Sequence, residues 1–100
     1  MRRDKMKAAK LKAGNYCAYQ ERTHQEVRDK LYALGLYSDE VEEILSDLIS
    51  ENFINEERYA KTYASGKFRL KQWGKRKIIF ALQQKHISTY CIDKAIKEIP

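Results

Sequence analysis

Apolar side chains recur along the chain with the spacing of amphipathic helices, and no stretch requires a strand. The clearest stripe lies in residues 38–51, where apolar residues stand at i, i+3, i+4, i+7 and i+8. They are Val41, Ile44, Leu45, Leu48 and Ile49. A stripe of this kind faces a core, and Ser38 is its predicted N-cap.

A capping box predicts where the preceding helix begins. In the stretch THQE, the Thr23 hydroxyl can accept from the Glu26 amide while the Glu26 carboxylate reaches back to the Thr23 amide. Gly35 can take the left-handed conformation that ends this helix. Its apolar line is Val27, Leu31 and Leu34. An earlier helix, over about residues 3–19, rests on Met6, Ala9, Ala13, Tyr16 and Cys17.

Three further helices are predicted in the second half. Asn55 can cap a fourth, which should run to about Trp73 and stop at Gly74. Its apolar face is predicted to hold Tyr59, Ala60, Tyr63, Ala64 and Leu70. A fifth helix, residues 75–85, should bury Ile78, Ala81 and Leu82. A sixth, capped by Ser88, should bury Ile92, Ala95, Ile96 and Ile99.

The apolar pattern repeats when the chain is shifted by 51 residues. The matching pairs are Ala9/Ala60, Ala13/Ala64, Val27/Ile78, Leu31/Leu82, Leu36/Ile87, Val41/Ile92, Leu45/Ile96 and Leu48/Ile99. Eight matches in one frame predict two copies of a three-helix unit, residues 1–52 and 53–100, in an all-α and elongated protein.

Length and composition agree with a small helical protein. The 100 residues are 34% charged and 43% apolar, with only four Gly and one Pro. No apolar run approaches the roughly 20 residues of a membrane span, and the start MRRDKMKAAKLKAG lacks the apolar core of a secretory signal. A cytoplasmic location is therefore expected. Cys17 and Cys91, without CxxC spacing, are predicted to be reduced packing residues.

No catalytic or metal-binding motif is found in the sequence. It has no Gly-rich phosphate loop, no HExxH and no GxSxG, and His24 and His86 stand at no helical spacing from a Cys or carboxylate that would suggest a nucleophile and its base. We therefore expect a protein that is not an enzyme, with no cofactor, metal or small-molecule substrate.

Charge is strongly segregated along the chain. Residues 1–22 carry seven bases and two acids, residues 23–57 two bases and ten acids, and residues 58–100 eleven bases and two acids. A basic tract can gather phosphates by releasing their counterions, whereas an acidic stripe repels nucleic acid. The alternative for any basic run is an ordinary solvated helix face.

The stretch FRLKQWGKRK, residues 68–77, is the strongest candidate for a binding surface. Lys75, Arg76 and Lys77 open the fifth helix at the positive end of its dipole, which folding alone does not favour. Lys67 falls within the apolar face of the fourth helix, so its stem must lie along the core, its ammonium must pair with an acid, or it must point into a groove for a ligand. An anionic partner would relieve the charge beside Trp73.

The segment FINEERYAKTYASGKFRLKQWGKRKIIFALQQKHI, together with RTHQEVRDKL upstream, resembles the RecX regulatory family. The matching positions are Phe53, Ile54, Asn55, Glu56, Arg58, Tyr59, Ala60, Lys67, Gly74, Ile78 and Leu82, and upstream Arg22, Thr23, Glu26, Lys30 and Leu31. The resemblance covers about residues 5–99. It implies tandem three-helix repeats, of which family members usually have three and this chain has two.

The resemblance also implies a role in DNA repair, recombination and the SOS response. RecX proteins bind in the groove of the RecA recombinase filament on DNA and inhibit strand exchange, ATP hydrolysis and coprotease activity. The expected partners are that filament and the single-stranded DNA within it. The residues expected to make contact are Arg58, Lys67, Arg69, Lys71, Trp73, Lys75, Arg76 and Lys77.

Two other kinds of function remain open from the residues. One is a small helical DNA-binding module without recombinase specificity, although residues 38–51, a would-be recognition helix, carry six acids and no base. The other is a helical-repeat adaptor for a protein partner. Comparing binding to bare DNA, to recombinase alone and to recombinase on DNA separates them.

Overall fold

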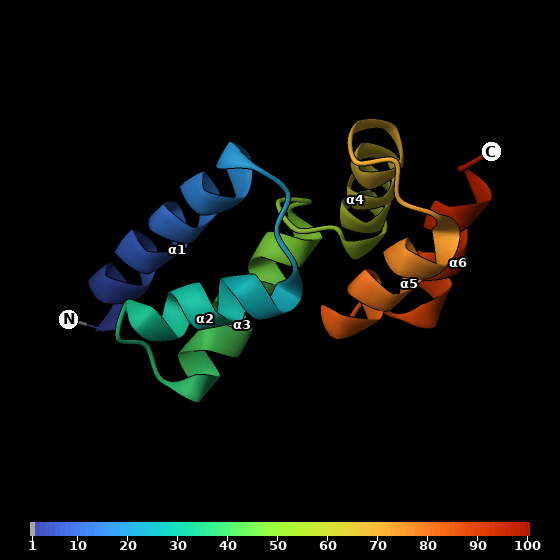
Figure 1. Cartoon of the computed structure of the whole chain (residues 1–100). Coiled ribbons are helices and arrows are strands. Elements are labelled where there is room, and N and C mark those ends of the chain that lie inside the picture. The colour runs from blue at the N-terminus through green and yellow to red at the C-terminus, as the bar shows by residue number, and fades with distance from the viewer. Residues whose placement is uncertain (1) are drawn as a thin grey trace. The chain divides into compact units, whose positions relative to one another are not determined.

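The computed structural model describes residues 2–100, which form six helices and no strand (Figure 1). The helices are α1 (Arg2–Tyr19), α2 (His24–Ala33), α3 (Ser38–Ser50), α4 (Glu56–Leu70), α5 (Lys75–Gln84) and α6 (Thr89–Lys97). They make two compact units of three helices each, divided between Asn55 and Glu56. The all-α fold of two three-helix repeats is thus confirmed.

Each unit has its own hydrophobic core. The eight residue pairs of the 51-residue frame supply most of it, because every member except Ile96 is buried and Ile96 packs against the second core. Ile54, beyond α3, is also buried in the first core. The predicted division at 52/53 had placed Ile54 in the second repeat.

The turns of the first unit show why its helices begin and end where they do. The Glu26 amide donates to Thr23 Oγ1 and the Thr23 amide donates to Glu26 Oε1, both at 3.0 Å, so the capping box is confirmed. Gly35 takes φ +89°, the predicted left-handed turn, and its carbonyl accepts from Lys5 Nζ at 2.7 Å.

The prediction of Ser38 as the cap of α3 is wrong. Ser38 is already helical and Tyr37 is the N-cap. The Tyr37 amide donates to Glu40 Oε1 at 2.9 Å, so the carboxylate of the third helical residue accepts the hydrogen bond of the N-cap amide. Glu40 is buried and also accepts from Arg2 Nε at 3.0 Å, which joins α1 to the start of α3.

The predicted end of the fourth helix at Trp73 is also wrong, because α4 ends at Leu70. Gln72 takes φ +57° and turns the chain back, and the Trp73 amide donates to the Lys67 carbonyl at 3.1 Å. Leu70, predicted on the apolar face, is 81% exposed because the helix stops there. Gly74 is the N-cap of α5, and Ser88 caps α6 as predicted, with its Oγ accepting from the Cys91 amide at 3.3 Å.

An ion pair recurs at the same place in both units. Lys10 Nζ on α1 lies 3.7 Å from Asp47 Oδ2 on α3, and Lys61 Nζ on α4 lies 3.0 Å from Glu98 Oε2 at the end of α6. The residues correspond in the 51-residue frame, so each pair links the first and third helix of its unit. Hydrogen bonds raise the pKa of both lysines, chiefly from Glu51 for Lys10 and from Glu98 for Lys61.

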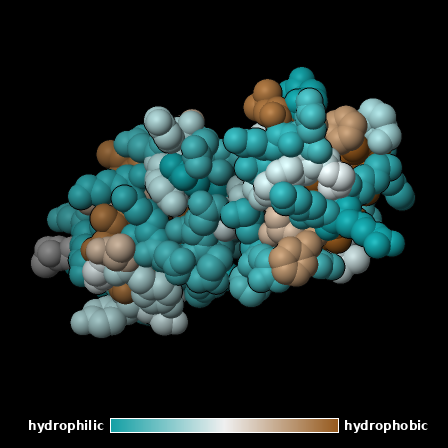
Figure 2. All heavy atoms as spheres, in the orientation of Figure 1, coloured by the Kyte–Doolittle hydropathy of each residue, from teal (hydrophilic) through white to brown (hydrophobic). Residues whose placement is uncertain are grey.

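The described residues contain no group of three or more His, Cys, Asp or Glu that could hold a metal ion. Cys17 lies within the first core and Cys91 packs against the second, so both have the packing role that was predicted. Nowhere in residues 2–100 is there a helix long and apolar enough to cross a membrane. In Figure 2 the visible surface is mainly hydrophilic, with apolar atoms in small separate spots.

The left-handed turn after the second helix of each unit gives a test of the repeat. Gly35 has φ +89° and its counterpart His86 has φ +61°. Gly35→Ala should lower the free energy of unfolding by about 1–2 kcal/mol, because a Cβ is strained in this conformation. Chemical denaturation measures the change. As the control, His86→Ala should change stability by less than about 0.5 kcal/mol, since a side chain already bears the strain there. Equal losses of stability at the two positions would contradict the assignment of the loss to a strained Cβ at position 35.

Candidate functional site

Two aromatic rings and three lysine ammonium groups converge on the second unit. Tyr63 and Trp73 meet edge to face, with ring centroids 6.5 Å apart. Lys67 Nζ lies 5.0 Å from the Trp73 ring and 5.4 Å from the Tyr63 ring. Lys77 Nζ lies 4.5 Å from Trp73, and Lys85 Nζ lies 5.5 Å from Tyr63. These five residues are called the aromatic–lysine cluster below.

The early end of α4 creates this cluster. Because the chain turns back at Gln72, Trp73 packs half-buried against the second core instead of continuing along the helix. Its amide is held by the Lys67 carbonyl, which brings the ring to the Lys67 side chain. Lys77 follows in the first turn of α5, and Lys85 is the C-cap of the same helix. The cluster thus joins α4 to both ends of α5.

The lysines of the cluster have no carboxylate partner within ion-pair distance in the described part of the chain. Their positive charge is met only by the ring faces, and such contacts contribute about 0.5–1 kcal/mol each at exposed sites. Partial burial raises the pKa of the Tyr63 phenol, so that ring is neutral at physiological pH and supplies no negative charge. The arrangement leaves unbalanced positive charge beside two aromatic rings.

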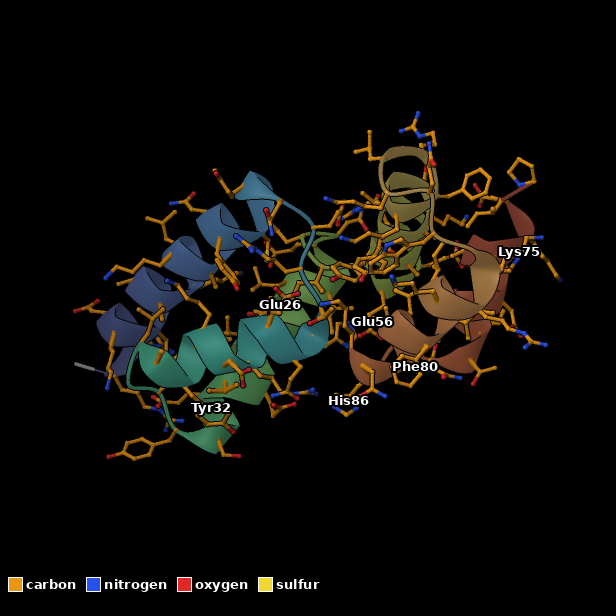
Figure 3. All side chains as sticks on the ribbon, in the orientation of Figure 1. Glu26, Tyr32, Glu56, Lys75, Phe80 and His86 are labelled. Atoms are coloured by element: carbon orange, nitrogen blue, oxygen red, sulfur yellow. The ribbon has the colours of Figure 1, made fainter. Side chains whose placement is uncertain are left out.

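The first turn of α5 adds to this charge. It contains no acidic residue and begins with Lys75, Arg76 and Lys77, all exposed. Each positive charge at this end of a helix costs about 0.3–1 kcal/mol at low ionic strength. Figure 3 shows Lys75 projecting outward from the start of α5. An anion bound here would be favoured by the helix dipole and by the side chains together.

The structure brings together only part of the predicted contact set. Lys67, Trp73 and Lys77 belong to the cluster, and Lys71, Lys75 and Arg76 are exposed on either side of Trp73 in sequence. Arg58 is half-buried in the first turn of α4, far along the helix from Lys67. Arg69 lines a separate groove with residues of α6.

Sequence reasoning missed two members of the cluster. Tyr63 was assigned to the core face of α4, and it does pack against the core while its ring still meets Trp73. Lys85 was assigned only to the end of a helix. The two residues come together by tertiary packing across α4 and α5, which helical spacing does not encode.

The first unit holds a corresponding contact with the residue types exchanged. Arg22 Cζ lies 3.6 Å from the Tyr16 ring centroid, and Arg22 Nε donates to the Tyr16 carbonyl at 3.0 Å. In the 51-residue frame, Tyr16 corresponds to Lys67 and Arg22 to Trp73. The aromatic residue is on the long helix in the first unit and in the turn in the second. Lys67 thus stands on α4 at the position that Tyr16 takes on α1.

Both units match known domains of one protein family. Residues 9–48 match the description "RecX, first three-helix domain" and residues 55–96 match "RecX, second three-helix domain". The chain belongs to the RecX family. Its two units correspond to two successive domains of RecX, and the family is one of regulatory proteins and not of enzymes.

Related RecX proteins are similar over most of this chain. The regulatory protein RecX of Lactococcus lactis subsp. cremoris is 33% identical over 97 residues, which is 96% of this chain and 36% of that protein. RecX of Streptococcus uberis is 33% identical over 84 residues, 84% of this chain and 33% of that protein. The chain therefore spans about a third of the length of these relatives.

Two solved structures have the same fold. The crystal structure of RecX from Lactobacillus salivarius has a TM-score of 0.85 at 32% identity, covering 93% of this chain and 60% of that one. A second crystal structure, of regulatory protein RecX, has a TM-score of 0.88 at 28% identity, covering 97% of this chain and 48% of that one.

The exchanged contact in the RecX second domain can be tested by a double-mutant cycle. Lys67→Tyr combined with Trp73→Arg would recreate the Tyr16–Arg22 arrangement of the first unit. The double variant should be more stable than the sum of the single changes by about 0.5–2 kcal/mol, because only it restores a cation over a ring between positions 67 and 73. Denaturant titration of the four proteins measures this coupling. Single changes that simply add would show that the two positions are independent.

Proposed function

We propose that this chain binds the RecA recombinase filament assembled on single-stranded DNA and inhibits its recombination and coprotease activities. Membership of a family of regulatory proteins named RecX supports the proposal. The observation that carries it is the aromatic–lysine cluster, where three lysines with no carboxylate partner among residues 2–100 surround Tyr63 and Trp73. Such a site suits a phosphate backbone with unstacked bases.

Single-stranded DNA offers both groups that the cluster can use. Its phosphates attract lysine and arginine side chains by counterion release, and its bases can stack on aromatic rings at about 1–3 kcal/mol each. Lys71, Lys75 and Arg76 would extend the phosphate contacts from the cluster. Trp73 would provide the ring, since it is only half-buried.

The acidic helix α3 of the first unit is better suited to contact a protein than DNA in the same complex. The exposed carboxylates of α3 include Asp39, Glu42 and Glu43, and a DNA groove would repel them. This observation argues against α3 as a recognition helix and against a simple DNA-binding module. A filament, which presents protein and DNA together, can accept both the acidic and the basic parts of the chain.

Replacing the lysines at the start of α5 tests the proposed contact. Lys75→Ala with Lys77→Ala should weaken binding to recombinase on single-stranded DNA and make the salt slope shallower by about 0.7 for each phosphate that is no longer neutralised. Fluorescence anisotropy with labelled oligonucleotide, at two salt concentrations, measures both quantities. Lys94→Ala with Lys97→Ala is the matched control, because it removes two charges from α6, away from the cluster.

The same titration distinguishes the functions. Tighter binding to the assembled filament than to bare DNA or to recombinase alone supports the regulator, and a fall in ATP hydrolysis on titration supports inhibition. Tight binding to bare DNA with no preference for the filament would favour a small DNA-binding module. An unchanged affinity and slope for the α5 variant would remove these lysines from the interface.

A further inference from the structure

A second group of cations and aromatic rings lies where α1 of the first unit ends. Tyr19, the last residue of α1, is 83% exposed although it is a large aromatic residue. Tyr16, one turn earlier, is half-buried and packs against the first core. Arg22, in the turn that follows, places its Cζ 3.6 Å from the Tyr16 ring centroid and 6.0 Å from the Tyr19 ring centroid. One guanidinium thus lies close to both rings.

Arg22 is held in place by the protein and serves to fix the turn. Its side chain is only 12% exposed, its Nε donates to the Tyr16 carbonyl at 3.0 Å, and its Nη1 lies 4.0 Å from Glu26 Oε2. The Glu26 carboxylate also accepts from the Thr23 amide in the capping box. Arg22 therefore offsets the charge of Glu26 and steadies the end of α1, while the Tyr19 ring stays open to solvent.

Two lysines bring positive charge to the same place. Lys30, in the last turn of α2, has its Nζ 5.4 Å from the Tyr16 ring centroid. Lys12 stands seven residues before Tyr19 on α1, so these two exposed side chains share one face of the helix. Neither lysine has an ion-pair partner among residues 2–100. The exposed ring of Tyr19 is thus accompanied by unbalanced positive charge from two helices.

The group occupies the place in its repeat that the aromatic–lysine cluster occupies in the second unit. In the 51-residue frame, Arg22 corresponds to Trp73 and Tyr19 to Leu70, which is 81% exposed and has no ring to stack. Both units therefore place a cation beside a ring at the end of their long helix. The ring that is open to solvent is Tyr19 in the first unit and the half-buried Trp73 in the second.

The chemistry of this group fits an unpaired nucleic-acid strand. An exposed aromatic ring can stack on a base, and lysine ammonium groups attract the phosphates that flank that base. A duplex does not fit, because its bases are already stacked on one another and do not reach a ring on the protein surface. An acidic peptide would use the lysines alone and leave the exposed ring of Tyr19 without a role.

We propose that Tyr19, Lys12 and Lys30 form a site for one unpaired base of single-stranded DNA and its flanking phosphates. Tyr19 stacks on the base, the two lysines contact the phosphates, and Arg22 holds the turn without contacting the strand. The site belongs to the first unit. It does not rest on the proposed function, since it involves neither the recombinase nor the aromatic–lysine cluster.

Titration of the ¹⁵N-labelled chain with a short single strand tests the site without recombinase. The probe is an oligothymidylate of about eight nucleotides, long enough for one small binding site. Saturable shifts of the Tyr19 and Lys30 amides are expected. A control strand with the same phosphates but abasic sugars should bind at these amides about fivefold or more weakly, because it offers no base to stack. No shift at either amide, or equal affinity for the two strands, would overturn the proposal.

Substitutions at two exposed tyrosines show whether the ring is the contact. Tyr19→Ala should weaken oligothymidylate binding by about fivefold or more, read from the Lys30 amide, whereas Tyr19→Phe keeps the ring and should stay within about twofold of the unchanged chain. Tyr37→Ala is the matched control, since Tyr37 is 75% exposed in the same unit but precedes Asp39 and Glu40. Equal weakening by Tyr19→Ala and Tyr37→Ala, or by both changes at Tyr19, would overturn the assignment.

The Trp73 indole resonance separates this site from the aromatic–lysine cluster in the same titration. Shifts at Tyr19 with an unchanged indole would support the site in the first unit while counting against the cluster. Indole shifts with unchanged Tyr19 and Lys30 amides would leave the proposed function standing and overturn the site in the first unit.

Discussion

Burial of the same apolar positions in two consecutive units is the constraint on which the rest of the structure depends. A three-helix unit of about 50 residues has little apolar surface to bury, so nearly every residue of its stripe is needed. Leu31 and Leu82, which correspond in the repeat, are both fully buried, as are Val27 and Ile78. The inward positions are therefore held nearly fixed, while outward positions are free to differ.

That freedom explains how one fold carries different charge in its two units, with nine bases and ten acids in residues 1–55 and eleven bases and four acids in residues 56–100. The first unit places its acids along α3, and the second places its bases along α4 and α5. The contact at the end of the long helix is kept as a cation on an aromatic ring, but the partners are exchanged between units. In the first unit the cation is Arg22, which is also near Glu26; in the second, Lys67 has no ion-pair partner within the part of the chain that the structure describes. Both units keep a cation on a ring at this place. We regard the Arg22 contact as structural because Glu26 is nearby, and the Lys67 contact as a candidate binding site because its charge is not balanced.

The sequence predicted the fold well because burial and capping leave local signals. The stripe of α3, the Thr23 capping box and the Gly35 turn all follow from spacing within a few residues, and all are present except that Ile49, predicted in the stripe, is exposed. The N-cap at Tyr37 was missed because Glu40 satisfies that end from inside the helix, with no side chain needed at the cap. The end of α4 was missed because Gln72, a residue without turn preference, takes the left-handed conformation.

The candidate site was only partly predictable for a different reason. Its charged members, Lys67 and Lys77, stand out in sequence, but Tyr63 and Lys85 join them through packing between helices. Arg58 and Arg69 look equivalent to them by composition and lie elsewhere. A run of charged residues in the sequence indicates a charged surface, but only the packing of the helices shows which residues form the site.

We propose that the aromatic–lysine cluster contacts the recombinase filament on DNA. Trp73 is the single tryptophan of the chain, so its indole N–H gives one resonance in a ¹⁵N-labelled sample. We predict that this resonance shifts or broadens on adding recombinase assembled on single-stranded DNA, and does so at lower concentration than with recombinase or DNA alone. An indole resonance that stays unchanged while the chain is bound to the filament would contradict the account.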